Sequence, residues 1–364
     1  MFLSCKPTVT VIGEEYEIIV NTNENGVIAV DVDGIRYFEE NSGVLSSEKN
    51  YAKIRLPQKP LDKAKKYTVV FRKSLKRVAY FSKLGEEERE DFRFKPVKSR
   101  GTVNAYHLAD IHGCFDLAKD AVSYFGSNLD LIILNGDYCE LDEEGDYLRF
   151  CRFMGEISHG RIPVILVRGN HDCRGTVADK YTDRLTANGK DTYYTFKAGW
   201  LRGIVLDLGE DKGDENVEYG GVNDFYGFRR RETAFLKGLN PKKCKPLFAV
   251  GHNSPAFNTS HIGDPKFDIE GELFSEWNRE LERLGIKFMI IGHFHKSYIL
   301  KKNDEKYRRP ADYPLIVGSE TNSDSFCGTA LTFQGNDLTV KITDTNKKVI
   351  KSCHIDLSSG ELSE

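Results

Sequence analysis

Apolar and polar residues alternate with a period of two in the first part of the chain. Tyr16, Ile18 and Val20 form one such face, and similar runs follow it. A period of two points alternate side chains to opposite faces, so several short strands are predicted. The dipeptides Asn25-Gly26 and Asp33-Gly34 lie between runs and predict tight hairpin turns, because these residues accept positive φ angles. This region is therefore predicted to be an all-β sandwich.

The sandwich is expected to end where the composition changes. The charged stretch Lys83–Glu90 is predicted to be its last loop, and Pro96 marks the exit. We therefore divide the chain into residues 1–98, a β-sandwich accessory domain, and residues 99–364, a catalytic domain. Two domains also suit a chain of 364 residues, which is longer than one hydrophobic core usually supports.

After Gly101, short apolar runs alternate with helical periodicity, as in α/β proteins. Residues 273–284 place apolar side chains on one face and precede Gly285, which predicts a helix and its C-cap. The end of the chain returns to the strand pattern around a Gly335-Asn336 turn, which predicts mixed or antiparallel strands. The other predicted strands are residues 103–109, 129–134, 163–167, 201–206, 246–250, 286–291 and 315–317.

Side chains that can bind metals directly follow five of these strands: Asp110 and His112, Asp137, Asn170, His252, and His293 and His295. Each of them alone is compatible with an ordinary loop, turn or cap. Strands that share a sheet bring the loops at their carboxyl ends to one edge, so together these residues predict one site. A His-x-His segment in extended backbone also directs both imidazoles to the same side.

These residues lie in motifs that resemble the signature of the calcineurin-like metallophosphoesterase superfamily. The motifs are Asp110-Ile111-His112, Gly136-Asp137, Gly169-Asn170-His171-Asp172, Gly251-His252 and Gly292-His293-Phe294-His295. They occur in the expected order over nearly two hundred residues. The resemblance implies a fold in which two sheets pack as a β-sandwich flanked by helices, in four layers α-β-β-α.

The resemblance also implies a role for each ligand. Asp110, His112 and His295 would bind one metal ion, Asn170, His252 and His293 would bind a second, and Asp137 would bridge them. Nitrogen and oxygen donors suit two divalent or mixed-valence transition metal ions, namely Mn, Fe, Zn or Co. Such a pair supplies metal-bound hydroxide that attacks phosphorus.

His171 is not assigned to a metal and is expected to act as the general acid that protonates the leaving oxygen. Asp172 is expected to orient His171 by binding its other ring nitrogen. The alternative for Asp172 is an ordinary carboxylate at the start of a helix.

The segment Leu61–Tyr67 resembles the tyrosine corner of fibronectin III and immunoglobulin-like domains. A sandwich of that kind before the catalytic fold is the domain order of purple acid phosphatases. The metal motifs differ, because those enzymes have glycine where His112 stands and an iron-binding tyrosine where Glu140 stands. Tyr138 lies at another spacing, so we expect no tyrosinate ligand.

A long, acidic and glycine-rich segment, Asp207–Arg231, is predicted to lie beside the site. Its aromatic residues are candidates to contact the substrate, and nearby arginines are candidates to neutralise phosphate. An equally good alternative is a solvated loop held by aromatic side chains. The candidate substrate-binding residues are Arg168, Arg174, Tyr219, Phe225, Tyr226 and Arg229, and His261 is a further histidine to test.

The formal net charge of −3 favours neither nucleic acid nor a membrane as a partner, so a small-molecule or exposed phosphoester is expected as substrate. Eight cysteines without a CxxC pair suit free thiols and predict a cytoplasmic protein. A lipoprotein or secreted origin stays open if a segment before Met1 has been removed, and a homo-oligomer also stays open.

The predicted function is hydrolysis of a phosphomonoester or phosphodiester. Two alternatives remain: a nuclease of the same superfamily, and a non-catalytic binding module on the same fold. The lack of a basic groove with interleaved aromatic residues disfavours the nuclease. A module without activity would have no need of all seven ligands and His171.

Overall fold

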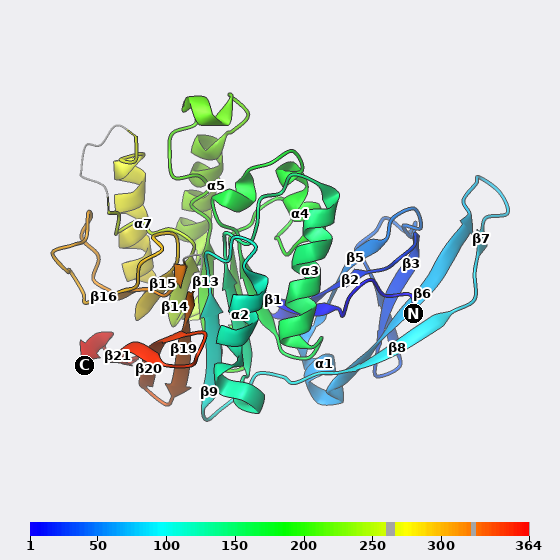
Figure 1. Cartoon of the computed structure of the whole chain (residues 1–364), viewed down its shortest axis with the longest axis horizontal. Helices are drawn as coiled ribbons and strands as arrows, with labels where there is room; N and C mark the ends of the chain where they lie inside the picture. Colours follow the sequence, from blue (N-terminus) through cyan, green and yellow to red (C-terminus); the bar gives the residue numbers. More distant parts are fainter. Residues whose placement is uncertain (260–265, 322–324, 364) are drawn as a thin grey trace.

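Residues 1–259, 266–321 and 325–363 are described in the computed structural model, where they form three β-sheets and flanking helices (Figure 1). His261 lies outside the described residues. No helix in the described part of the chain is long and apolar enough to span a membrane.

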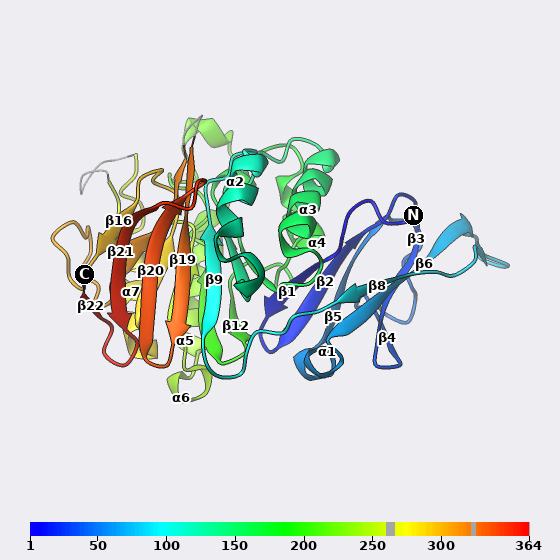
Figure 2. The same ribbon diagram turned by 60° about the horizontal axis from the view of Figure 1, so that its bottom comes forward.

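The largest sheet combines strands from the beginning, the middle and the end of the chain. Its strands are β1 Thr8–Ile12, β2 Glu15–Asn21, β5 Tyr51–Pro57, β9 Val103–Leu108, β10 Leu131–Asn135, β11 Val164–Val167, β18 Glu320–Thr321, β19 Phe326–Gln334, β20 Asp337–Asp344, β21 Val349–Asp356 and β22 Glu361–Ser363. They pair in the order β22-β21-β20-β19-β9-β10-β11-β1-β2-β5, with β18 beside β19. Figure 2 shows β21, β20, β19 and β9 side by side. The tail strands are antiparallel, which confirms the prediction for the end of the chain.

The second sheet has the order β12-β13-β14-β15-β17-β16. Its strands are β12 Tyr194–Ala198, β13 Leu201–Leu206, β14 Phe248–Gly251, β15 Phe288–Ile291, β16 Tyr298–Leu300 and β17 Leu315–Val317. It packs face to face on the largest sheet, since both sheets contribute to one apolar core that includes Ile133 and Ile165 from one side and Val205, Phe248 and Ile290 from the other.

Helices cover the outer faces of both sheets. The helices α2 Phe115–Val122 and α3 Glu144–Ser158 pack on the largest sheet, and α5 Phe225–Gly238 and α7 Gly271–Leu284 pack on the second. The four-layer arrangement implied by the resemblance is therefore present. The predicted helix ends as expected at Gly285, whose φ is 79°. The short elements are α4 Tyr181–Arg184, α6 Pro241–Cys244, η1 Ser123–Asn128, η2 His171–Cys173, η3 Ala178–Lys180 and η4 Val217–Tyr219.

The third sheet, at the amino-terminal end, contains β3 Gly26–Val32, β4 Ile35–Phe38, β6 Lys66–Lys76, β7 Lys83–Leu84 and β8 Glu88–Arg93, and α1 Gln58–Ala64 precedes β6. Its apolar face shares a core with β1, β2 and β5, so two sheets are packed together here. Thr10 of β1, however, pairs with Val164 of β11. One sheet thus crosses the expected boundary at Ser99, and the division into residues 1–98 and 99–364 stays a prediction.

Two local predictions for this region are wrong. Asp33-Gly34 forms the expected hairpin between β3 and β4, but Asn25-Gly26 does not, since β2 and β3 lie in different sheets. Gly26 is required for space instead, because a Cβ there would collide with the Phe71 ring. The charged stretch 83–90 is not a loop, since much of it pairs with β6 as β7 and β8.

The tyrosine-corner prediction is also wrong. Such a tyrosine bonds to the backbone a few residues upstream, whereas the Tyr67 hydroxyl donates to the carbonyl of Gly160 at 2.7 Å. Tyr67 therefore ties the third sheet to the end of α3. A fibronectin III identity for the sandwich stays without support.

Candidate metal centre

The predicted ligands meet at one edge of the two packed sheets. The strands β9, β10 and β11 are parallel in one sheet, and β14 and β15 are parallel in the other. Each predicted ligand lies in a loop that follows the carboxyl end of one of these strands. The seven residues therefore meet at one sheet edge, although they are separated by up to 185 residues in the sequence, and four of them, Asp137, Asn170, His293 and His295, line a crevice there.

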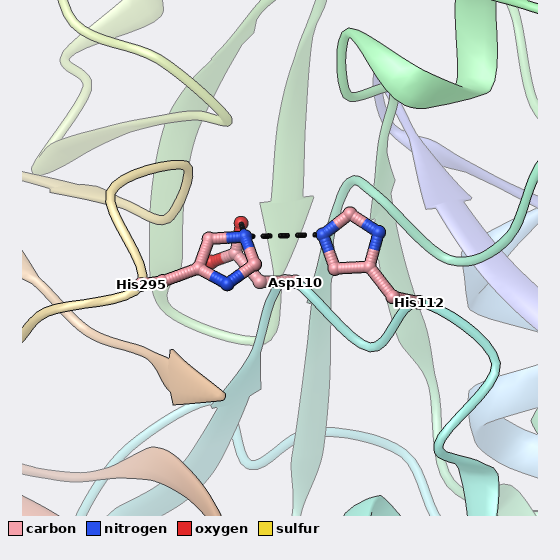
Figure 3. Close-up of side chains that lie close together, drawn as sticks. All are labelled: Asp110, His112 and His295. Atoms are coloured by element: carbon pink, nitrogen blue, oxygen red, sulfur yellow. Dashed lines mark hydrogen bonds and ion pairs between the residues drawn. The ribbon is translucent and has the colours of Figure 1, made fainter. Parts of the chain in front are cut away.

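Asp110, His112 and His295 form the first group of potential metal ligands (Figure 3). The Nε2 atoms of His112 and His295 are 3.1 Å apart, and His295 Nε2 lies 3.6 Å from Asp110 Oδ1. Two donors on one ion with bonds of about 2.1 Å are separated by roughly 3.4 Å in tetrahedral geometry. The spacing of this group fits a shared metal ion.

The second group contains Asp137, His252 and His293. His252 Nε2 lies 3.1 Å from Asp137 Oδ2, and His293 Nδ1 lies 3.0 Å from the side-chain oxygen of Asn170. Asp137 Oδ2 also lies 3.7 Å from His112 Nε2 of the first group. One carboxylate oxygen thus faces histidines of both groups.

Backbone conformation at the site is unusual. Asp110, His112, Asp137, His293 and His295 all have φ between 44° and 73°, a region that residues other than glycine rarely adopt. Such conformations cluster where a binding site over-determines the backbone.

The motif glycines provide space for these ligands. A Cβ at Gly169 would collide with Asp137 Oδ1, and one at Gly292 would collide with Ala109 and approach Asp110 Oδ2. The Gly-Asn and Gly-His pairs of the motifs therefore have a steric origin.

His252 provides the clearest sign that a cation belongs at the site. Its Nδ1 donates to the carbonyl of Asn135 at 2.7 Å, which leaves Nε2 as the free nitrogen. That Nε2 is buried and makes no hydrogen bond with any described residue, although Asp137 Oδ2 is close. A buried polar atom without a hydrogen bond is costly unless another group satisfies it. The donors at the site therefore fit a transition metal.

Charge in the crevice perturbs the pKa values. Burial lowers the pKa of His252, but the carboxylates of Asp137 and Asp110 outweigh burial and raise it to about 10. Burial, followed by the charge of His252, lowers the pKa of His293 to about 4. Both shifts follow from the ionisable groups that are packed together in this buried part of the site.

Asp172 does not orient His171 as predicted. Its carboxylate accepts hydrogen bonds from the backbone N–H groups of Asp137, Tyr138 and Gly169, at 2.7–3.0 Å. Burial, and then the charge of Asp137, raises the pKa of Asp172 to about 7. These hydrogen bonds connect the loop after β10 to the loop after β11, which carry the predicted ligands Asp137 and Asn170.

The ring of His171 faces other partners. Its Nδ1 lies 3.6 Å from Glu140 Oε1, and its Nε2 lies 3.3 Å from Arg174 Nη1. Glu140 stands where purple acid phosphatases have tyrosine. Tyr138 points into the core, where its hydroxyl donates to the carbonyl of Leu134 at 2.9 Å.

Of the predicted substrate-binding residues, Arg174 lines the crevice, which has a volume of about 370 Å³. Its guanidinium is fixed by Glu210, with both Nε and Nη2 at 2.7 Å from the carboxylate. Tyr219 does not line the crevice but donates to Glu210 at 3.0 Å. Tyr219 therefore contacts the carboxylate that holds Arg174 in place.

Arg168 and Arg229, which were predicted to bind substrate, are not among the residues that line the crevice. Arg168 is paired with Asp207 at 2.7 Å and packs on the ring of Phe225. Arg229 is buried, with hydrogen bonds to the carbonyls of Leu208 and Glu210 and an ion pair with Glu270.

The aromatic candidates Phe225 and Tyr226 also lie away from the crevice. Phe225 is buried beside Gly209 and Arg168, and Tyr226 is exposed below Arg230. Sequence reasoning missed the aromatic residues that do line the crevice, Phe267 and Phe294.

Other functional partners were missed as well. Asn135 positions His252 through its carbonyl and donates its side-chain N–H to Gly251 O and towards His107. Ser319 donates to the Asp110 carboxylate, and Thr321 to the Asp110 carbonyl. Asn135 is the last residue of β10, and Ser319 and Thr321 follow β17, so their place at the ends of strands was the available signal. His107 is buried, as expected for a structural histidine.

Comparison with known proteins agrees with this geometry. A family model described as calcineurin-like phosphoesterase matches residues 103–297. No curated protein matches the chain. The structure of purple acid phosphatase PPD1 from yellow lupin (Lupinus luteus) seeds is similar, with a TM-score of 0.61 and 11% identity over 96% of this chain and 74% of that chain. A structure of PhoD is similar with a TM-score of 0.54 and 11% identity, over 99% and 92% of the two chains.

At this identity the two structures show a shared fold alone. The family model spans more than half of the sequence and covers every metal-ligand motif. The chain therefore belongs to the calcineurin-like phosphoesterase family.

Proposed function

We propose that the protein hydrolyses a small phosphomonoester or phosphodiester with a dinuclear metal centre. The observation that carries this proposal is the position of Asp137 Oδ2, which faces His252 of one ligand group at 3.1 Å and His112 of the other at 3.7 Å. A single carboxylate oxygen between two sets of imidazoles suits a bridge between two cations.

In this proposal Asp110, His112 and His295 hold one metal ion, and Asn170, His252 and His293 hold the other. The donor set suits Mn, Fe, Zn or Co, since Ca²⁺ prefers oxygen ligands. When bound, two such ions act as Lewis acids on the phosphoryl oxygens and make hydroxide available near neutral pH.

His171 is proposed to protonate the leaving oxygen. Arginine has only donors, so in the present arrangement His171 Nε2 accepts from Arg174 and the ring proton lies on Nδ1, facing Glu140. A phosphoester oxygen that accepts the Arg174 N–H would release Nε2. Nε2 could then take up a proton from solvent, with Nδ1–H still facing Glu140, and pass it to the leaving oxygen.

The lining of the crevice supports a small substrate. Among the described residues that line the crevice, Arg174 and Lys212 have positively charged side chains. Arg174 is paired with Glu210, and Lys212 is paired with Glu218. Phe267 and Phe294 add apolar surface. A nuclease groove usually needs a track of free cations with stacking aromatics, which this lining does not offer.

The proposal can be tested with one panel of substrates. The purified protein, reconstituted with Mn, Fe, Zn or Co, is assayed against a chromogenic phosphomonoester, the matching diester, cyclic nucleotides and nucleotide sugars. We expect hydrolysis of at least one of them, loss of activity with a chelator, and close to two metal ions per chain by elemental analysis. Less than one bound metal per chain without hydrolysis would instead indicate a binding module.

A pair of variants tests whether Glu140, rather than Asp172, orients His171. Glu140→Gln is expected to lower kcat about two- to fivefold with no change in Tm, because an exposed ion pair contributes roughly 0.2–1 kcal/mol. Asp172→Ala is expected to reduce the free energy of unfolding by about 2–3 kcal/mol, because it leaves three buried N–H groups without acceptors. An unchanged Tm in Asp172→Ala, together with an unchanged kcat in Glu140→Gln, would contradict a structural role for Asp172 and an orienting role for Glu140.

A further inference from the structure

The tip of the β6–β7 hairpin, residues 75–82, presents apolar side chains to solvent. The exposed fractions are 50% for Leu75, 43% for Val78, 81% for Tyr80 and 94% for Phe81. These are four of the twelve exposed large apolar residues in the described part of the chain, within eight consecutive positions. Apolar residues gathered in this way usually mark an interaction site.

The hairpin projects away from the body of the protein. Figures 1 and 2 both show it extending beyond the other strands of the third sheet. The partner strand β3 begins at Gly26, opposite Lys73, so the part of β6 beyond Lys73 continues without that neighbour. The tip therefore stands free on a two-stranded stalk.

The tip is built as an ordered turn. Ser82 Oγ accepts from the Val78 N–H at 3.2 Å and donates to the Val78 carbonyl at 2.8 Å, which closes the loop. Phe81 has φ of 62°, which is costly for a bulky residue. Phe81 is also the most exposed aromatic residue in the described part of the chain.

Positive charge surrounds these apolar residues. Residues 73–85 contain Lys73, Lys76, Arg77 and Lys83 and no acidic residue, in a chain whose net charge is −3. Lys73 is paired with Glu24, while Lys76, Arg77 and Lys83 have no ion pair with any described residue. Acidic residues resume after Gly85, at the base of the stalk, where Glu87 is paired with Arg36 and Arg89.

We propose that this hairpin tip inserts into the surface of an anionic lipid bilayer. Aromatic and aliphatic side chains at the level of the headgroups, with basic residues behind them, are the chemistry that binds such an interface. A stable protein interface would use roughly 20–30 residues on each side, far more than this tip offers. The protein would bind peripherally, and the phosphoesterase site would remain in water.

The test is co-flotation of the whole protein with vesicles of phosphatidylcholine alone or mixed with phosphatidylglycerol. We expect binding to the mixed vesicles, and at least about tenfold weaker binding for both Y80S/F81S and K76E/R77E. V349S/I350S, which alters two exposed apolar residues on β21, is the matched control and should bind like the wild type. All variants should hydrolyse a soluble substrate at the wild-type rate, which verifies folding.

Equal binding of wild type and Y80S/F81S, or equal binding to neutral and anionic vesicles, would overturn the proposal. So would a concentration-dependent dimer that Y80S/F81S abolishes, since the tip would then bind a second copy of the chain.

Discussion

Asp137→Asn is expected to lower kcat for a chromogenic phosphoester by about 10³-fold or more and to reduce metal content below two ions per chain. The Lewis-acid contribution of a metal centre is several kcal/mol, and each 1.4 kcal/mol corresponds to about tenfold in rate. Asparagine has nearly the same volume and tolerates the positive φ of 55°. The substitution therefore removes the bridging charge with little change in backbone conformation. Metal analysis and steady-state kinetics measure both effects.

Asp130→Asn is the matched control for this experiment. Asp130 is equally buried and lies directly before the first residue of β10, at the end of the strand opposite to Asp137. It pairs there with Lys95 and Lys98. The control should lose stability but retain its metals and, once folded, its kcat. If Asp137→Asn instead retains two metals and full activity, the bridging assignment is incorrect.

His171→Ala is expected to lower kcat by about 10²–10⁴-fold on an ester with an alkyl leaving group, because a general acid contributes that much. The loss should be much smaller with a nitrophenolate leaving group, which departs without a proton. Metal content should be unchanged. The measurement is kcat across a series of leaving groups, with exposed His354→Ala as control.

An equal loss for all leaving groups would contradict the general-acid role of His171. A loss of metal together with activity would make His171 a ligand. The two outcomes are distinguished by elemental analysis of the same samples.

Local patterns in the sequence predicted most of the catalytic fold, for physical reasons. Runs such as residues 131–134 of β10 are buried on both faces, which leaves a continuous apolar signal. Pairing between distant strands leaves no such signal. The hydrogen bonds of β1 with β11 involve the backbone alone, and so their partner could not be read from residues 8–12. For the same reason Gly26 was taken for a turn.

At the site, too, some residues could be predicted from the sequence and others could not. The seven predicted ligands could be found in the sequence because metal binding restricts both residue type and order. Arginine chemistry is not so restricted, since one guanidinium serves equally well for a phosphate or a buried carboxylate. Arg168 and Arg174 both pair with a carboxylate, and only the three-dimensional structure shows that Arg174 lines the crevice and Arg168 does not.

The net charge of the whole chain does not describe the local charge of the β6–β7 hairpin. The value of −3 averages over the whole chain and argued against an anionic membrane. Charge acts over a Debye length of roughly 8–10 Å, so the local excess at Lys76, Arg77 and Lys83 is the relevant quantity for a projecting hairpin.

The pairing of β1 with β11 affects how the chain can be divided. A fragment that starts at Ser99 would leave Val164–Val167 as an unpaired, fully apolar edge in the middle of what is now a continuous sheet. Such an edge is a template for aggregation with other chains. Strand β1 therefore protects the edge of the catalytic sheet at β11 from pairing with other chains, in addition to any role in binding.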